Sequence, residues 1–138
     1  MGVYFVDVGH KDDVVLRDKL LGLLKYYWDV FLSSQDENGS ADSYYKDLLN
    51  FERADLYAGM ISQSCPASLY HLGRIDCCKK ENFLLCRAEE IQFFYNIPLI
   101  GRSNNLKILD YSNQNEVLGF VQQHVWSLSS GSNGTRHY

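Results

Sequence analysis

The amino-acid sequence predicts a single α/β domain in which a five-stranded parallel sheet carries helices on both faces. Short apolar segments alternate with longer amphipathic segments along the chain, and parallel strands need crossover connections of this kind. The length of 138 residues is typical of one domain. The residues are 46% hydrophobic and 14% aromatic, with only two prolines, which is typical of a folded globular protein.

The expected strands are short apolar segments that end at turn residues. The first, residues 3–9, is a nearly continuous apolar run that ends at Gly9, as is typical of a buried parallel strand. The second, residues 29–34, is followed by an Asn-Gly pair that predicts a turn over residues 35–40. The same reasoning places the remaining strands at residues 55–62, 82–86 and 105–111.

Between these strands, apolar residues recur at helical spacing. From Asp12 to Tyr27 they fall on one face, which predicts an amphipathic helix of about four turns. Pro66 suits the first turn of a helix, because its missing N–H has no helical partner at that position. Further helices are expected over residues 40–54, 66–78, 88–95 and 114–128. We therefore expect one domain over residues 1–128 and a flexible C-terminal tail over residues 129–138.

The charge and the cysteines narrow the class of partner. The net charge of −4 and the lack of a basic cluster argue against a nucleic-acid partner. No segment has the apolar character of a signal peptide or of a bilayer-spanning helix, so we expect a cytoplasmic protein with no membrane partner. The four cysteines contain no CxxC pair, and no histidine pair has the spacing of metal ligands, so we expect reduced thiols and no metal.

The expected strand order locates a candidate ligand site. By analogy with other small doubly wound folds, we expect the flavodoxin-like order 2-1-3-4-5, in which ligands bind beyond the carboxyl ends of the first and third strands. Glycines, small hydroxyl side chains and helix N-termini in these turns offer hydrogen-bond donors to phosphate. The candidate ligand-binding residues are Gly9, His10, Lys11, Ser33, Ser34, Gly39, Ser62, Ser64 and Ser68. An alternative interpretation is that the last three serines only cap the third helix.

Four motifs occur in an order that is typical of a known superfamily. They are GHKDD after the first strand, the glycine-bearing loop at residues 36–40, ADLYAGMIS at residues 54–62 and YHLGRI at residues 70–75. Together they resemble the Toll/interleukin-1 receptor (TIR) domain in its bacterial TIR-like branch, which is close in fold to the nucleoside 2-deoxyribosyltransferases. The resemblance covers about residues 3–125.

The resemblance implies binding of NAD or a related ribonucleotide and cleavage of its N-glycosidic bond. TIR-like enzymes cleave the bond between nicotinamide and ribose in NAD, and both families typically use a glutamate in the third helix. A carboxylate suits this reaction because it stabilises the oxocarbenium character that develops at the anomeric carbon. Here His71 stands where that glutamate is expected and Ala67 where a tryptophan is expected. Neutral imidazole carries no charge and protonated imidazole has the wrong sign, so the glutamate's role does not transfer to His71.

The substitution leaves the catalytic residues open. His71 is interpreted as a packing residue, a ligand-contacting donor or a general acid or base. Asp7 and Asp36, or Glu37 beside the latter, are candidate replacement carboxylates because the fold directs their segments toward the same cleft. The pair at residues 89–90 is interpreted instead as a solvated helix start. The candidate catalytic residues are therefore His71, Asp7 and Asp36.

Two further functions remain as alternatives. The first is a catalytically silent TIR-like module that self-associates, or binds a TIR-type protein partner, through residues 35–40. The second is an enzyme of the nucleoside deoxyribosyltransferase type, which would also need the missing carboxylate. The sequence predicts the fold and the ligand class more strongly than it predicts an active enzyme.

Overall fold

A five-stranded parallel sheet forms the centre of the computed structural model, which describes the backbone of residues 1–33 and 41–135 and side chains through residue 129. The strands lie in the order β2-β1-β3-β4-β5, and every neighbouring pair is parallel. This confirms the predicted fold class and strand order. The strands are β1 (Gly2–Val8), β2 (Asp29–Leu32), β3 (Leu56–Ile61), β4 (Glu81–Arg87) and β5 (Ile108–Tyr111).

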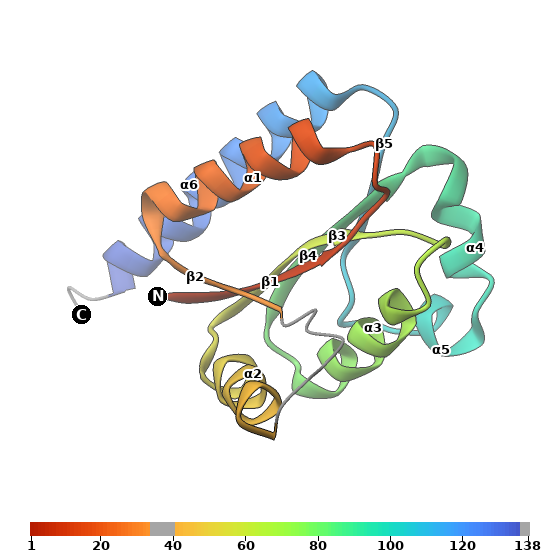
Figure 1. Cartoon of the computed structure of the whole chain (residues 1–138). Helices are drawn as coiled ribbons and strands as arrows, with labels where there is room; N and C mark the ends of the chain where they lie inside the picture. The colour runs from red at the N-terminus through yellow and green to blue at the C-terminus, as the bar shows by residue number, and fades with distance from the viewer. Residues whose placement is uncertain (34–40, 136–138) are drawn as a thin grey trace.

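The helices cover both faces of this sheet (Figure 1). Two long helices, α1 (Val14–Tyr27) and α6 (Gln114–Thr135), pack on one face. The other face is covered by α2 (Ala41–Arg53), α3 (Ala67–Cys78), α4 (Ile91–Tyr95) and α5 (Pro98–Gly101). A 3₁₀ turn, η1 (Ala88–Glu90), joins β4 to α4.

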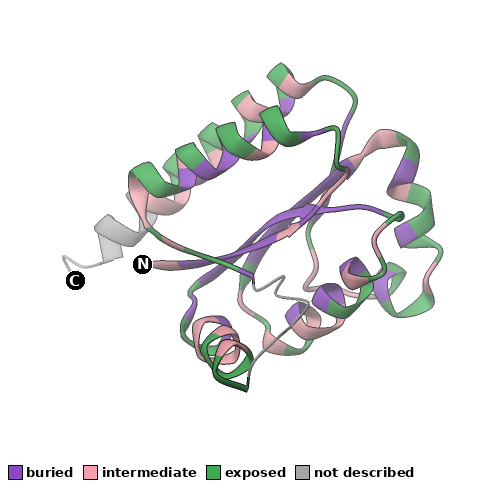
Figure 2. Ribbon diagram, in the orientation of Figure 1, coloured by how far each residue is buried: buried purple, intermediate pink, exposed green. Residues whose placement is uncertain are grey.

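Side chains alternate along β1 and so divide the core into two layers. These layers lie on either side of central strands that are mostly buried (Figure 2). Val3 and Phe5 pack toward α1 and α6, whereas Tyr4 and Val6 pack toward the opposite layer of helices. Every residue of β3, the central strand, is buried. Because Val8 of β1 pairs with Ile61 of β3, both strands end at the same edge of the sheet.

Several element boundaries differ from those expected. Residues 88–95, expected as one helix, form η1 and then α4, and the unexpected short helix α5 begins with Pro98 at its first position. The strand expected from residue 105 begins at Ile108. Before it, the Asn105 side-chain amide donates to the Ile75 carbonyl oxygen of α3 at 3.2 Å. Residues 129–135, expected as a flexible tail, continue α6. Adding residues to a formed helix costs less free energy than nucleating one, even for Ser and Gly.

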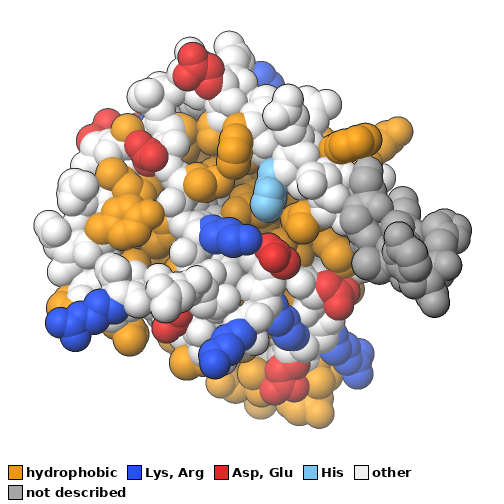
Figure 3. Space-filling model, turned by 180° about the vertical axis from the view of Figure 1, so that it is seen from behind, with side chains coloured by type: hydrophobic (Ala, Val, Ile, Leu, Met, Phe, Trp, Pro, Cys, Tyr) orange, Lys and Arg blue, Asp and Glu red, His pale blue; other side chains and the backbone are white. Residues whose placement is uncertain are grey.

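The molecular surface carries charges of both signs. On the face seen in Figure 3, hydrophobic patches lie between Lys or Arg side chains and Asp or Glu side chains. No helix in the described ranges is both long enough and apolar enough to span a bilayer. Because acidic and basic side chains are mixed on the face seen in Figure 3, this face presents no continuous basic surface.

Candidate functional site

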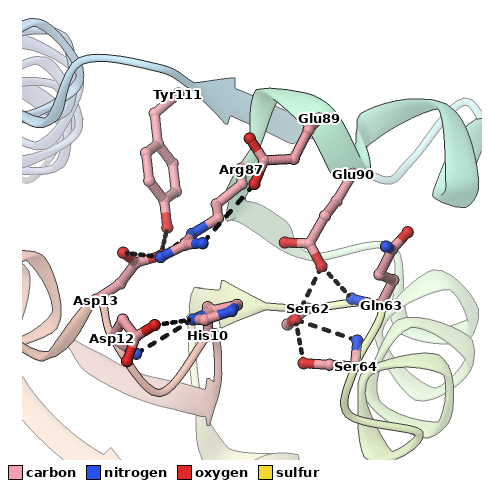
Figure 4. Close-up of polar contacts among 10 residues, drawn as sticks. All are labelled: His10, Asp12, Asp13, Ser62, Gln63, Ser64, Arg87, Glu89, Glu90 and Tyr111. Atoms are coloured by element: carbon pink, nitrogen blue, oxygen red, sulfur yellow. Dashed lines mark hydrogen bonds and ion pairs between the residues drawn. The ribbon is translucent and has the colours of Figure 1, made fainter.

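The turns that follow β1, β3 and β4 meet at the carboxyl edge of the sheet (Figure 4). His10 lies in the turn after β1, Ser62 and Ser64 lie in the turn after β3, and Glu90 ends the η1 turn after β4. The edge lies at the reversal of strand order, where α/β proteins of this type bind ligands. The structure thus brings His10, Ser62 and Ser64, all predicted ligand-binding residues, to the same edge as the Glu90 carboxylate, which was not predicted as a site residue.

A buried hydrogen-bond chain links the turn after β3 to Glu90. The Ser62 hydroxyl donates to Glu90 Oε1 at 2.9 Å, and the Gln63 backbone N–H donates to the same oxygen at 2.8 Å. The hydroxyl oxygens of Ser64 and Ser62 lie 2.7 Å apart, which extends the chain toward solvent. Glu90 is only 4% exposed, and its second oxygen, Oε2, has no hydrogen-bond partner among the described residues.

The interpretation of residues 89–90 as a solvated helix start is therefore wrong for Glu90. Glu89 is exposed, with 73% of its side-chain surface accessible, whereas Glu90 turns inward toward Ser62. Adjacent residues of a helical turn point in different directions, so only one of the two can face the sheet edge. The signal that could have identified a buried carboxylate is the position of this pair directly after β4, beside the switch point.

Of the other predicted serines, Ser68 holds the turn after β3, and Ser33 bonds the backbone of β1. Ser68 is fully buried and bonds Ser62 twice: its hydroxyl donates to the Ser62 carbonyl oxygen at 2.9 Å and accepts from the Ser62 N–H at 3.0 Å. Ser33 is also buried, and its hydroxyl oxygen accepts from the Asp7 N–H at 3.4 Å. The N-cap residue of α3 is Pro66, which makes no side-chain cap bond, so the alternative that Ser62, Ser64 and Ser68 only cap this helix is not supported. Ser34, Asp36 and Gly39 lie outside the described residues.

The turn after β1 packs tightly against β3. A Cβ atom on Gly9 would lie 2.7 Å from the Cβ of Met60, so only glycine fits without a shift of this contact. His10 Nδ1 accepts a hydrogen bond from the Asp12 N–H at 3.2 Å, and the Lys11 side chain is exposed. A cavity of about 70 Å³ beside this turn accommodates water or one ligand group, and is too small for a whole nucleotide.

Asp7 and His71, both candidate catalytic residues, belong to opposite layers of the fold. Asp7 follows the alternation of Val3 and Phe5 toward α1, where its Oδ2 lies 3.0 Å from Arg17 Nη1. His71 belongs to α3, which covers the other face of the sheet. The sheet therefore separates the two side chains, and they do not form a catalytic pair.

The environment of His71 keeps its imidazole neutral. The side chain is 6% exposed, and Nδ1 has no hydrogen-bond partner among the described residues. Burial lowers the pKa of His71 to about 4, and the positive charge of Arg74 acts in the same direction. His71 thus carries no charge at pH 7, which does not support its interpretation as a general acid.

A partly exposed arginine organises the surroundings of His71. The Arg74 guanidinium lies 3.9 Å from the centre of the Phe51 ring and pairs with Asp47 at 3.6 Å. Asp47 also accepts a hydrogen bond from the Tyr4 hydroxyl at 2.7 Å. Burial and this hydrogen bond to Asp47 raise the pKa of Tyr4, so its hydroxyl remains protonated.

A second polar cluster fixes the start of α1 to the sheet edge. Arg87 donates to both carboxylate oxygens of Asp13, at 2.9 and 3.0 Å, and the Tyr111 hydroxyl donates to the same carboxylate. Burial alone would raise the pKa of Asp13, but the hydrogen bonds from Arg87 and Tyr111 outweigh it and hold the pKa below its usual value. Among the residues that the structure describes, no three His, Cys, Asp or Glu side chains are grouped as metal ligands.

Comparisons with known proteins support the fold. No protein-family model matches the chain, and no curated protein matches it. Among solved structures, the chain is similar to the CMP N-glycosidase BcmB of Clostridium botulinum, with a TM-score of 0.65 and 20% sequence identity. The match covers 90% of this chain and 99% of that one. At this identity the likeness establishes the α/β fold, and the TIR-like assignment is not confirmed.

Proposed function

We propose that this chain binds a ribonucleotide at the carboxyl edge of β1, β3 and β4 and hydrolyses its N-glycosidic bond. The observation that carries the proposal is the buried Glu90 carboxylate, which is held by the turn after β3 at the switch point. The same fold occurs in a CMP N-glycosidase, which supports a nucleotide as the ligand class. NAD, the ligand that the resemblance to TIR-like domains implies, is one of the nucleotides included in this proposal.

The chemistry of the bond accounts for the need for a carboxylate. As the base departs, positive charge develops on the sugar ring, and a nearby anion stabilises it. Water then supplies a hydroxyl to the anomeric carbon and a proton to the base, so the products are the free base and the sugar phosphate. His71 is neutral and cannot supply the negative charge, whereas Glu90 is a carboxylate at the edge of the site.

The N-termini of two helices offer N–H donors to the phosphate of such a ligand. Helices α1 and α3 both begin near this edge, and the N–H groups of a helix N-terminus attract anions. Lys11, exposed just before α1, adds a positive charge that can move toward the ligand. These donors favour a nucleotide over an uncharged nucleoside.

The proposal is tested with purified protein and a panel of CMP, AMP, NAD and cytidine. Release of free base together with an equal amount of the sugar product, followed by chromatography, is the expected result. Addition of a second base separates hydrolysis from deoxyribosyl transfer, which would yield a new nucleoside. The absence of both product release and ligand-induced thermal stabilisation, at high protein concentration and under conditions that favour self-association, overturns the proposal.

A catalytically silent assembly module remains the second candidate, because a neutral histidine occupies the position of the helix carboxylate. The variant His71→Glu separates the two. If the proposed ligand site at the edge of β1, β3 and β4 is intact, this substitution places a negative charge on α3 and raises base release by about 10-fold or more. If the module only assembles, His71→Glu gives no release, whereas changes at Asp36 or Gly39 shift the oligomeric state measured by light scattering.

A further inference from the structure

Only one oxygen of the buried Glu90 carboxylate has hydrogen-bond donors. Two donors, the Ser62 hydroxyl and the Gln63 N–H, hold Oε1. Oε2 is buried and has no hydrogen-bond partner within the described ranges. Because Oε1 has two donors from a single turn, the carboxylate cannot rotate freely, and the direction of Oε2 is set.

A buried carboxylate oxygen without a hydrogen-bond donor is unusual inside a protein. Burying a carboxylate oxygen without a donor costs free energy, and buried polar atoms are nearly always paired. A buried carboxylate oxygen without a donor, at the edge of the sheet where such folds bind ligands, can accept a hydrogen bond from a bound ligand.

The nearest arginine of the same segment is engaged elsewhere. Arg87 directs two of its nitrogens to Asp13, and a third lies 3.7 Å from Glu89. Figure 4 shows Glu90 Oε2 directed away from Ser62 and Gln63, toward the middle of the site. Gln63 and Ser64 are exposed, so the turn that holds Oε1 also borders solvent.

We propose that Glu90 Oε2 accepts a hydrogen bond from a ribose hydroxyl of the bound nucleotide. Acidic side chains beyond the strand ends of α/β folds receive ribose hydroxyls in this way, because a carboxylate offers two acceptors to a sugar diol. The inference rests on the proposed function and adds a specificity: the site selects ribonucleotides over nucleotides that lack a sugar hydroxyl. Glu90 is thereby a ligand-binding residue.

The test measures dissociation constants by calorimetry for CMP, 2′-deoxy-CMP, 3′-deoxy-CMP and UMP. The wild-type chain is expected to bind CMP roughly 10- to 100-fold more tightly than at least one deoxy analogue, as for a hydrogen bond to a charged group. Glu90→Gln should weaken CMP binding by a similar factor and remove the discrimination. Glu89→Gln, the matched control on the adjacent exposed carboxylate, should bind within about twofold of the wild type.

Each outcome bears on the inference. Equal wild-type affinity for CMP and both deoxy analogues overturns it without the need for a variant, which covers the case in which Glu90→Gln fails to fold. A loss of affinity in Glu90→Gln that is the same for all sugars shows a structural role and also overturns it. Discrimination of CMP from UMP that disappears in Glu90→Gln would assign Oε2 to the base amine instead. If the wild type binds no nucleotide of the proposal's panel, the proposed function itself fails.

Discussion

Ser62 Oγ lies 2.9 Å from Glu90 Oε1, so one buried hydrogen bond joins two turns that are 28 residues apart in the sequence. The bond fixes the end of β3 to the segment that follows β4. The site therefore depends on a long-range contact between a hydroxyl and a carboxylate. Its contribution to stability can be measured separately from any ligand.

Ser62→Ala should lower the free energy of unfolding by about 1–3 kcal/mol, because a buried carboxylate loses one of its donors. Ser64→Ala is the matched control: Ser64 is exposed, and its loss should cost less than about 1 kcal/mol. Urea unfolding at pH 7 measures both variants. Equal losses for the two serines would contradict the importance of the bond to Glu90.

The pair of Arg87 with Asp13 should matter more than the other ion pairs at this edge. The Asp13 side chain is 5% exposed, so Arg87→Met leaves a buried carboxylate without its cation and should cost about 3–5 kcal/mol. Arg17→Met is the control, since the Arg17 pair with Asp7 is 37% and 22% exposed and should contribute less than about 1 kcal/mol. Denaturant unfolding of both variants compares these costs.

The ion pair of Arg87 with Asp13 also predicts that the free energy of unfolding depends on pH. Because the pKa of Asp13 is lowered in the folded state, its contribution is complete above the unfolded pKa of about 3.9 and is lost as pH falls through the lower folded value. The difference in stability between the wild type and Arg87→Met should therefore shrink below about pH 4. A difference that grows with acid would contradict this assignment.

The lowered pKa of His71 predicts a second dependence of stability on pH, at higher pH than that of Asp13. Its folded pKa of about 4 lies below the ordinary value of 6.5, so the unfolded chain binds more protons between these values. Stability should be complete above about pH 6.5 and fall by roughly 2–4 kcal/mol as pH drops toward 4. In His71→Leu this part of the slope should vanish. NMR titration of the His71 imidazole checks the cause directly, and a midpoint between pH 6 and 7 would refute it.

The fold could be predicted from local patterns because each pattern has a direct physical cause. The apolar runs of β1 and β3 are buried on both faces, and the leucines of α1 recur on one face, so their periods reveal the elements. Weak periodicity caused the errors, as in residues 88–95, where a 3₁₀ turn precedes a helix of five residues. Local composition does not reveal such short elements.

The candidate site was predicted less completely, because it depends on the contact between Ser62 and Glu90, which lie 28 residues apart in the sequence. The switch-point rule selected Ser62 and Ser64 as candidates, and both follow directly after β3. It could not indicate that Glu90 turns inward to meet Ser62, since this depends on how η1 leaves β4. In the same way, the distance between Asp7 and His71 in sequence gave no sign that the sheet separates them.

Gly59 lies within β3 at a position where the structure leaves no room for a side chain. Its φ of 152° is rarely adopted by other residues, and a Cβ atom there would lie 2.1 Å from the Val6 carbonyl oxygen. Because that oxygen belongs to the backbone of β1, no side-chain movement relieves the clash, and β1 and β3 must separate beside the candidate site.

Gly59→Ala should therefore cost more than about 3 kcal/mol or prevent folding. Gly22→Ala is the opposite control: Gly22 lies on the exposed side of α1 with no atom within 4 Å of an added Cβ, so alanine should stabilise the helix by about 0.5–1 kcal/mol. Thermal unfolding of both variants decides the matter. If Gly59→Ala unfolds within a degree or two of the wild type, the close approach of β1 and β3 is wrong, and so is the edge on which the site is built.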